Sequence, residues 1–331
     1  MIVVLTGGTG GAKFLQGLQQ VVAPSELTVI INTGDDLLWW GLHVSPDIDS
    51  VLYGLAGVLS RDRGWGLEGE TFRCLEAMRR LGMPTWFQLG DNDLATHLTR
   101  TELLSNGRTL SQATQEIAHR FGVQARLLPM SDDRIETRVL TTNGEMSFQQ
   151  YFVRERHALE PLRVTYVGAE RARPAPGVLE AIKAAESVIV APSNPITSIG
   201  PILAVPGIRE ALRSTTAPVA AISPIVAGAA VSGPAGALMR CTGVDVSAGG
   251  VAHFYGDFLD VLIADYCDRK NVRVPGVRTE FCYTIMASDE MKRTLATEVL
   301  DAVKSARRAP TQSAAENLYE AQTGSKGIVS V

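Results

Sequence analysis

The chain has 331 residues, of which 45% are hydrophobic and 20% are charged. This composition supplies a sizeable apolar core and excludes a predominantly disordered chain. The formal net charge of −4 argues against a surface built for nucleic acid, because such surfaces carry an excess of Lys and Arg. The 31 glycines favour an α/β protein with many tight turns between strands and helices.

The sequence favours a cytoplasmic protein without a membrane span. Cys74, Cys241, Cys267 and Cys282 form no CxxC pair, so we expect free thiols in a reducing compartment. The first five residues lack the basic start of a signal peptide. Stretches 187–208 and 214–239 are uncharged, but their many Pro and Gly residues would leave backbone groups unpaired in lipid. We expect buried strands and loops there.

The first 60 residues predict a strand, a glycine-rich loop, a helix and a second strand. Apolar runs at 2–5 and 27–31 flank the glycines of 7–11 and a helical repeat of apolar residues. This order opens a doubly wound, mostly parallel, Rossmann-like α/β sheet. Ser45 is then placed to cap a helix whose first residue is Pro46.

Further along, the pattern predicts helices, a hairpin and more strands. Helices are expected near 71–81, 93–104 and 111–121, and strands at 125–128, 135–141, 145–152, 163–167, 187–191, 219–223 and 261–265. We predict a Rossmann-like nucleotide-binding core at 1–60 and 161–308, with an inserted helical and β-hairpin subdomain at 61–160 on the acceptor side. The small, polar stretch 309–331 predicts a flexible tail.

The loop after the first strand is typical of a phosphate cradle. Gly7, Gly8, Thr9 and Gly10 carry little bulk, and the helix that follows offers free N–H groups and the positive end of its dipole. Lys13 adds a cation in the first turn. The pattern is neither GxGxxG nor a Walker A motif, and a tight turn without a ligand stays open.

Acidic residues follow at the same edge of the predicted sheet. Asp36 comes after the second strand, and Asp47 and Asp49 lie in the first turn of the next helix. Carboxylates there suit Mg²⁺ or a substrate hydroxyl, and we predict these three as the Mg²⁺ ligands. An Asp-rich turn and a helix stabilised by its own acids are the alternatives.

Two uncharged loops after later strands extend the candidate donor site. The first offers hydroxyl, amide and backbone donors through Ser193, Asn194, Thr197, Ser198 and Gly200. Residues 223–236 repeat that design, and such loops favour a phosphorylated or nucleotide substrate. No GxSxG elbow is present, so phosphoryl transfer by positioning and Mg²⁺ is the favoured chemistry.

Asp91 or Asp93 is predicted to cap a helix that carries His97. The spacing around His97 supports no zinc site. A lone histidine on a helix is most often structural.

As a set, seven segments resemble the 2-phospho-L-lactate transferase (CofD-like) family. In family order they read TGGTGGAK (6–13), NTGDD (32–36), SPDID (45–49), LGDNDLATH (89–97), LPMSDD (128–133), APSNPITSIGP (191–201) and SGPAG (232–236). Each segment alone is unspecific, whereas the set is specific.

The resemblance implies a step in coenzyme F-420 biosynthesis. The family moves a phospho-carboxylic-acid unit (lactyl, enolpyruvyl or glyceryl) from a guanosine diphosphate adduct to the ribityl hydroxyl of the deazaflavin Fo, and releases GMP with the help of Mg²⁺. Members are typically cytosolic dimers. The glycine loop and 193–200 would face the diphosphate, while Asp49 and position 88 would face the deazaflavin. Position 88, where a basic residue is expected, is Gln88.

A flat deazaflavin needs aromatic or apolar walls and a carboxylate near its polyol tail. We predict that Trp65 and Trp86 supply the walls, with Gln88, Asp91 and His97 nearby. Asp49 would orient or deprotonate the attacking hydroxyl, and Asp47 is the second catalytic candidate.

Two other classes compete with this interpretation. YvcK-like proteins resemble the family in the glycine loop and core, but bind nucleotide-sugars and act as non-catalytic regulators. An NAD-dependent oxidoreductase is disfavoured by the glycine spacing. The sequence leaves open which three-carbon acid is transferred.

Overall fold

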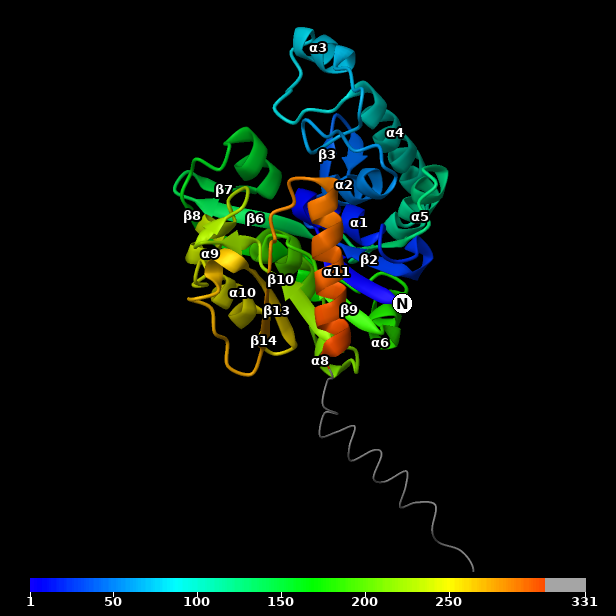
Figure 1. Cartoon of the computed structure of the whole chain (residues 1–331). Helices are drawn as coiled ribbons and strands as arrows, with labels where there is room; N and C mark the ends of the chain where they lie inside the picture. Colours follow the sequence, from blue (N-terminus) through cyan, green and yellow to red (C-terminus); the bar gives the residue numbers. More distant parts are fainter. Residues whose placement is uncertain (307–331) are drawn as a thin grey trace, which may run out of the picture.

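The computed structural model describes residues 1–306. Its centre is a seven-stranded sheet in which all neighbouring strands run parallel (Figure 1). In spatial order the strands are β14 (Arg278–Cys282), β13 (Val261–Asp265), β10 (Val219–Ile222), β9 (Ser187–Val190), β1 (Ile2–Thr6), β2 (Leu27–Ile31) and β5 (Arg126–Pro129).

The strand order reverses at β1. From there the chain proceeds through β2 to β5 on one side, and later through β9, β10, β13 and β14 on the other. The sheet is therefore doubly wound, as predicted, and its switch point lies between β1 and β9. Doubly wound sheets bind their ligands at this point, outside the carboxyl ends of the strands.

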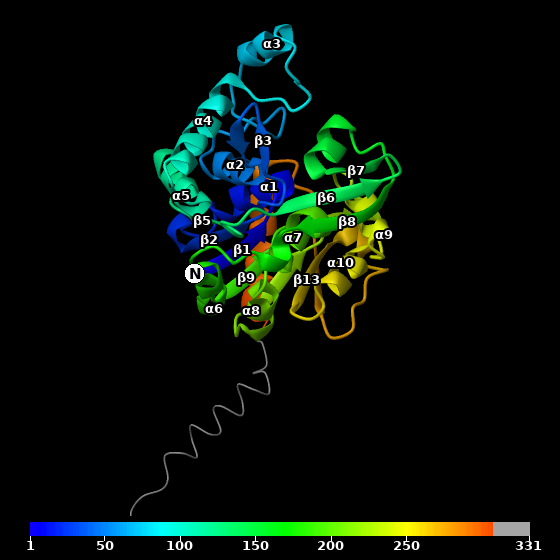
Figure 2. The same cartoon turned by 180° about the vertical axis from the view of Figure 1, so that it is seen from behind.

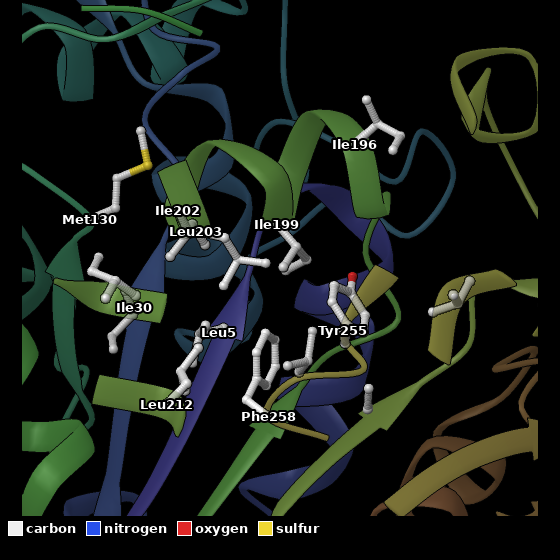
Figure 3. Packing of buried hydrophobic residues seen from close by; sticks show 14 of the residues in the cluster. Leu5, Ile30, Met130, Ile196, Ile199, Ile202, Leu203, Leu212, Tyr255 and Phe258 are labelled. Carbon is white, nitrogen blue, oxygen red and sulfur yellow. The ribbon is translucent and has the colours of Figure 1, made fainter. Parts of the chain in front are cut away.

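Alternation along each strand sends side chains into two cores. Val3 and Leu5 of β1 lie in the core on one face, whereas Ile2 and Val4 lie in the core on the other. Figure 3 shows part of the first core, with Leu5 of the sheet below Ile199. Because both faces are covered, the middle strands are continuous apolar runs, which is why the sequence predicted them correctly.

Helices cover both faces of the sheet. The core that holds Ile2 and Val4 is covered by α1 (Gly8–Leu18), α2 (Pro46–Leu55), α5 (Leu110–Arg120) and α11 (Asp289–Ser305). The opposite core is covered by α6 (Val178–Ala184), α7 (Gly200–Ala204), α8 (Ile208–Ser214), α9 (Ala235–Cys241) and α10 (Ala248–Phe254).

Two outlying parts extend beyond the central sheet (Figures 1 and 2). One contains the hairpin β3 (Leu37–Trp39) and β4 (Leu42–Val44), with α3 (Arg73–Arg80) and α4 (Asp91–Ser105). The other is an antiparallel sheet in the order β7 (Gly144–Ser147), β6 (Glu136–Thr141), β8 (Pro161–Val167), followed along the chain from β7 by the π-helical turn η2 (Gln150–Arg154).

The remaining elements are short. They are the hairpin β11 (Ile225–Val226) and β12 (Ala229–Ala230), and the helical turns η1 (Pro24–Glu26), η3 (Ala169–Arg171), η4 (Pro195–Ile199) and η5 (Tyr266–Asp268). Within residues 1–306, no helix combines the length and apolar character needed to cross a membrane. Stretches 187–208 and 214–239 hold the expected buried strands and turns, and also short helices that were not predicted.

Strand pairing does not follow the predicted boundaries of the insertion at 61–160. β5 lies inside that range but pairs with β2 in the main sheet, and β8 lies outside it but pairs with β6. Pairing is decided by contacts between distant segments, which a local pattern does not contain. The division into domains itself stays a prediction, and the predicted tail at 309–331 lies outside the described residues.

The strand predicted at 145–152 is wrong beyond Ser147. The N–H of Ser147 donates to Gln150 Oε1 at 3.0 Å, and the N–H of Gln150 donates to Ser147 Oγ at 3.3 Å. These reciprocal bonds turn the chain into η2, as a capping box starts a helix. Two further elements were not predicted: β14, whose side chains are mostly half-buried, and α11.

Leu295→Ala tests the packing of α11 on the sheet. Leu295 is 0% exposed, so we expect the free energy of unfolding to fall by about 2–5 kcal/mol in urea denaturation. Leu98→Ala is the control, because Leu98 on α4 is 56% exposed and its truncation should cost no more than about 0.5 kcal/mol. Equal stability of the two variants would contradict the placement of α11.

Candidate active site

The loops after β1 and β9 are bonded to each other. The Oγ of Ser193 donates to the carbonyl of Gly7 at 2.7 Å and accepts from the Gly7 N–H at 3.2 Å. A Cβ on Gly10 would lie 2.5 Å from the carbonyl oxygen of Pro192, so only glycine lets the two loops approach this closely. The structure thus brings together two of the segments predicted to hold the donor.

The other predicted donor residues differ in how the protein uses them. Asn194 Oδ1 accepts from the N–H groups of Ile196 and Thr197 at 3.0 and 3.4 Å, and so caps η4. The Thr197 hydroxyl is buried and has no hydrogen-bond partner within residues 1–306. Of the remaining residues predicted to bind the donor, Thr9 and Lys13 are exposed, whereas Ser198 and Gly200 are buried.

Three largely buried aspartates lie between the glycine loop and the β3–β4 hairpin. Asp47 accepts from Asn32 Nδ2 at 2.8 Å and from the Gly8 N–H, yet burial raises the pKa of Asp47 to about 6. Burial, and then the charge of Asp47, raises the pKa of Asp35; burial also raises the pKa of Asp36. Within residues 1–306, the Oδ1 atoms of Asp35 and Asp36 have no hydrogen-bond partner.

This cluster fits a divalent cation. Carboxylates held together away from water repel one another, which a bound cation relieves, and their oxygens are ligands that Mg²⁺ prefers. The unpartnered Oδ1 atoms of Asp35 and Asp36 are available to it. Among the described residues, no three Asp, Glu, His or Cys side chains converge to hold a metal by themselves, so substrate oxygens would have to complete the shell.

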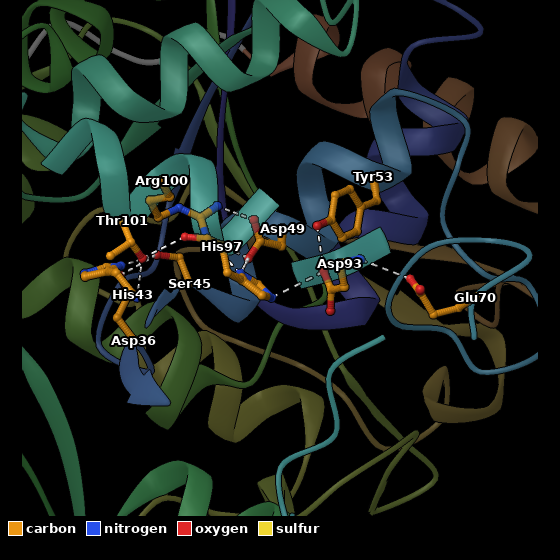
Figure 4. A network of polar contacts seen from close by, with 10 residues as sticks. All are labelled: Asp36, His43, Ser45, Asp49, Tyr53, Glu70, Asp93, His97, Arg100 and Thr101. Atoms are coloured by element: carbon orange, nitrogen blue, oxygen red, sulfur yellow. Dashed lines mark hydrogen bonds and ion pairs between the residues drawn. The ribbon is translucent and has the colours of Figure 1, made fainter. Parts of the chain in front are cut away.

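A buried polar network ties α4 to α2 (Figure 4). Arg100 is 0% exposed, and both of its terminal nitrogens bind the Asp49 carboxylate, with Nη1 3.1 Å from Oδ2. His97 Nδ1 lies 3.6 Å from Asp49, and its Nε2 lies 3.4 Å from Asp93. Tyr53 donates to Asp93 at 2.7 Å. Because each buried charge needs its partner, the network fixes α4 against α2.

The structure gives Asp49 and Ser45 partners that the sequence did not predict. Asp49 engages Arg100 with both carboxylate oxygens, and its catalytic role stays a prediction. Ser45 occupies the N-cap position of α2, as predicted, but its side chain makes no capping bond. Its hydroxyl instead donates to Asp36 at 2.7 Å, because a buried carboxylate needs donors. Burial and the charge of Arg100 lower the pKa of neighbouring His43 to about 4.

A cleft of about 380 Å³ opens beside Asp35 and Asp36, within the range of about 300–1,000 Å³ typical of small-molecule sites. Its other lining residues come from the β3 hairpin, its neighbours, and the β6–β7–η2 region: Gly34, Leu37, Leu38, Trp39, Trp86, Arg134, Glu136, Thr137, Arg138, Ser147, Phe148, Gln149 and Gln150. Trp86 meets Trp39 edge to face, with ring centroids 4.7 Å apart. The cleft therefore has fixed aromatic walls and acidic residues in its lining.

The structure separates the residues predicted to hold the acceptor. Trp86 lines the cleft, whereas Trp65 packs on Phe72 with ring centroids 6.3 Å apart. Gln88 is exposed. His97 lies in the buried network beside Asp49. Their functional roles stay predictions, but only Trp86 of this set lines the cleft.

Asp91 caps a different helix from the one predicted. It accepts from the N–H groups of Arg73 and Cys74 at 3.0 and 2.9 Å, at the start of α3. The start of α4 is served instead by Glu70, which accepts from the Asn92 N–H at 2.6 Å. The prediction that Asp91 or Asp93 caps α4 is therefore wrong. Asp91, at the start of α4, binds the start of α3, while Glu70, which precedes α3, binds the start of α4.

Several cleft residues were not predicted as site residues: Trp39, Phe148 and Gln149, and Asp35, which was recognised only as part of an acidic segment. Asp35 belongs to the motif NTGDD, and its place beside Asp36 was the available signal. The other three come from separate segments, and no local pattern marks them.

The fold is that of a doubly wound α/β protein, with a cleft and a group of aspartates beside its parallel sheet. The family model of CofD, 2-phospho-L-lactate transferase, matches residues 2–303. The chain belongs to the CofD family of 2-phospho-L-lactate transferases, and is a transferase of coenzyme F-420 biosynthesis.

Relatives with two different names are equally similar to the chain. A phosphoenolpyruvate transferase from Streptomyces griseus is 44% identical over 315 residues, which cover 92% of this chain and 99% of the relative. A 2-phospho-L-lactate transferase from Methanosarcina acetivorans is 44% identical over 298 residues, which cover 89% and 96%. Identity alone therefore does not choose between the two activities.

A solved structure shares the fold. It is a member of the UPF0052 family from Bacillus halodurans, with a TM-score of 0.59 and 18% identity, and the match covers 90% of this chain and 98% of that chain. At this level of identity the likeness concerns the fold alone.

Arg100→Leu tests the buried ion pair. Loss of the guanidinium leaves Asp49 buried and unpaired, so we expect the free energy of unfolding at pH 7 to fall by about 3–5 kcal/mol. The double variant Arg100→Leu/Asp49→Leu should regain much of that loss, because apolar replacements of a buried pair are often nearly neutral. If the double variant is no more stable than the single one in urea denaturation, the pair is not what holds α4 to α2.

Proposed function

We propose that the chain transfers a phosphorylated three-carbon acid from a guanosine diphosphate adduct to the ribityl hydroxyl of the deazaflavin Fo, and releases GMP. Membership of the CofD family supports this class of reaction. The observation that carries the proposal is a continuous row of groups, from the glycine loop through Asp47, Asp35 and Asp36 to the aromatic cleft. The proposal includes a homodimer in the cytoplasm, on the family resemblance alone.

On the donor side, the diphosphate would lie along the glycine loop. The first turn of α1 has no side-chain cap and supplies backbone N–H groups and the positive end of the helix dipole. The unpartnered hydroxyl of Thr197 and the neighbouring uncharged loop after β9 add neutral donors. These groups bind phosphate oxygens and the nucleoside without a cluster of Lys or Arg.

Asp35 and Asp47 are the residues that would hold Mg²⁺, together with phosphate oxygens of the donor. Asp36 adjoins them, whereas Asp49, the remaining predicted ligand, is occupied by Arg100. When bound, the cation neutralises charge on the transferred and leaving phosphates. This assignment keeps Asp47 from the predicted ligand set, adds Asp35, and leaves Asp36 for the acceptor hydroxyl.

On the acceptor side, the deazaflavin ring would enter the cleft between Trp86 and Phe148, with its polyol tail toward Asp36. The tail hydroxyl attacks the phosphorus that carries the acid, and the bond from this phosphorus to the oxygen of GMP breaks. The hydroxyl proton passes to Asp36, whose raised pKa suits a proton acceptor. Asp49 acts through Arg100, whose charge faces Asp36.

GMP release tests this function. The purified protein, Fo and Mg²⁺ are incubated in turn with the lactyl, enolpyruvyl and glyceryl adducts of guanosine diphosphate. We expect one GMP for each Fo consumed and a preference of about 10–200-fold for one adduct, the usual range for small differences in a pocket. GMP release that does not depend on Fo, or no release with any adduct, would refute the proposal.

Removal of the metal tests the aspartate cluster. Activity should vanish in EDTA and return when Mg²⁺ is added. At millimolar Mg²⁺, Asp35→Asn should lower turnover by at least about a hundredfold, because a charged metal ligand is lost. Asp132→Asn is the control. Asp132 accepts a hydrogen bond from the Ser111 N–H at 2.7 Å and does not line the cleft. Full activity in EDTA, or an equal effect of both substitutions, would remove Asp35 from the metal site.

A further inference from the structure

Two adjacent glutamines in the cleft lining are used differently by the fold. The amide oxygen of Gln150 accepts from the Ser147 N–H at 3.0 Å, and this bond helps to start η2. Gln149 also lines the cleft and is only 6% exposed. Within residues 1–306, its side-chain amide has no hydrogen-bond partner. One amide thus serves the fold, and the other is left available.

The amide nitrogen and oxygen of Gln149 are not fully enclosed by protein, so water or a ligand in the cleft can bond to them. The position of Gln149 is also firmly set. It directly precedes the π-helical turn η2, a type of turn found frequently at functional sites. Its neighbour Phe148 stacks on Phe152, with ring centroids 5.5 Å and planes 3° apart. A ligand in the cleft can therefore bond to an amide that is held in a fixed position.

Several other polar groups around the cleft are already engaged. Arg138 and Arg134 pair with Glu136 at 3.5 and 3.8 Å. Gln150 is bonded to Ser147. The Thr137 hydroxyl and the Trp39 indole N–H are unpartnered lining groups, but neither carries a donor and an acceptor on two adjacent atoms. The unpartnered Oδ1 atoms of Asp35 and Asp36 are acceptors when ionised, so they offer no donor. Among these groups, Gln149 is the neutral side chain that offers a donor and an acceptor side by side.

We infer that Gln149 is a specificity-determining residue that binds the imide edge of the heteroaromatic ring in the cleft. This inference rests on the proposed function, in which the cleft binds Fo. The pyrimidinedione ring of a deazaflavin carries C=O, N–H and C=O along one edge. A primary amide has two N–H donors and one carbonyl acceptor. Its carbonyl accepts from the ring N–H while its NH₂ group donates to an adjacent ring carbonyl.

The test compares Fo with an Fo analogue methylated on the imide nitrogen, both titrated by their fluorescence against the full chain. The parent protein should bind Fo about tenfold more tightly than the methylated analogue, the scale of one good hydrogen bond. Gln149→Leu should bind both ligands with the same, weaker affinity. Trp86→Ala is the matched control, which should weaken both ligands by equal factors because a ring face does not read the imide.

Gln149→Glu provides a second variant of nearly the same shape, with thermal unfolding recorded for each protein. It keeps an acceptor for the ring N–H but loses the donor, so Fo should bind several-fold more weakly while the preference over the methylated analogue persists. A Gln149→Leu protein that still prefers Fo about tenfold, or binds it as the parent does, overturns the inference alone. A parent protein that binds no Fo, or is unaffected by Trp86→Ala, overturns the acceptor site of the proposed function as well.

Discussion

The grouping of four largely buried aspartates at one edge of the sheet constrains the elements around it. Carboxylates removed from water must be supplied with donors or countercharges. Asp49 receives the guanidinium of Arg100, Asp47 receives the amide of Asn32, and Asp36 receives a hydroxyl from the turn before α2. Each donor comes from a different element. Satisfying the charges therefore draws α4 and the β3–β4 hairpin onto the sheet edge.

The same constraint connects the two halves of the proposed reaction. The donor side is built where β1 and β9 diverge, and a serine from one loop is bonded to a glycine of the other. The acceptor side is the cleft between the β3 hairpin and the β7–η2 region. The aspartates lie between these two sides. In the proposed reaction, this cluster of carboxylates therefore lies where the donor phosphate and the attacking hydroxyl would meet.

Similarity to known proteins identifies the family of this chain but not which three-carbon acid it transfers. The chain is 44% identical both to a phosphoenolpyruvate transferase and to a 2-phospho-L-lactate transferase. The difference between such acids involves a few atoms, which a few pocket contacts discriminate. The solved structure at 18% identity shares the fold, and a fold by itself does not define a reaction. The match over residues 2–303 favours a transferase over a non-catalytic regulator.

The sequence by itself determined the middle of the sheet and the family. Strands such as β1 and β9 are buried on both faces, so their apolar runs are visible without knowledge of their neighbours. The segments at the strand ends identified the family because they come from the loops that build the site. Asp36, Asp47 and the glycine loop were predicted as site residues in this way.

Only the tertiary structure decided which side chains meet. Arg100 and Asp49 are 51 residues apart, and nothing in the local pattern of α4 marks that arginine as the partner of a buried aspartate. Trp39, Phe148 and Gln149 reach one cleft from separate segments, and Asp91 was found to cap α3 instead of α4. Periodicity reports the direction in which a side chain faces, toward the core or toward solvent. The identity of its neighbour depends on how distant segments pack, and packing is settled by the whole chain at once.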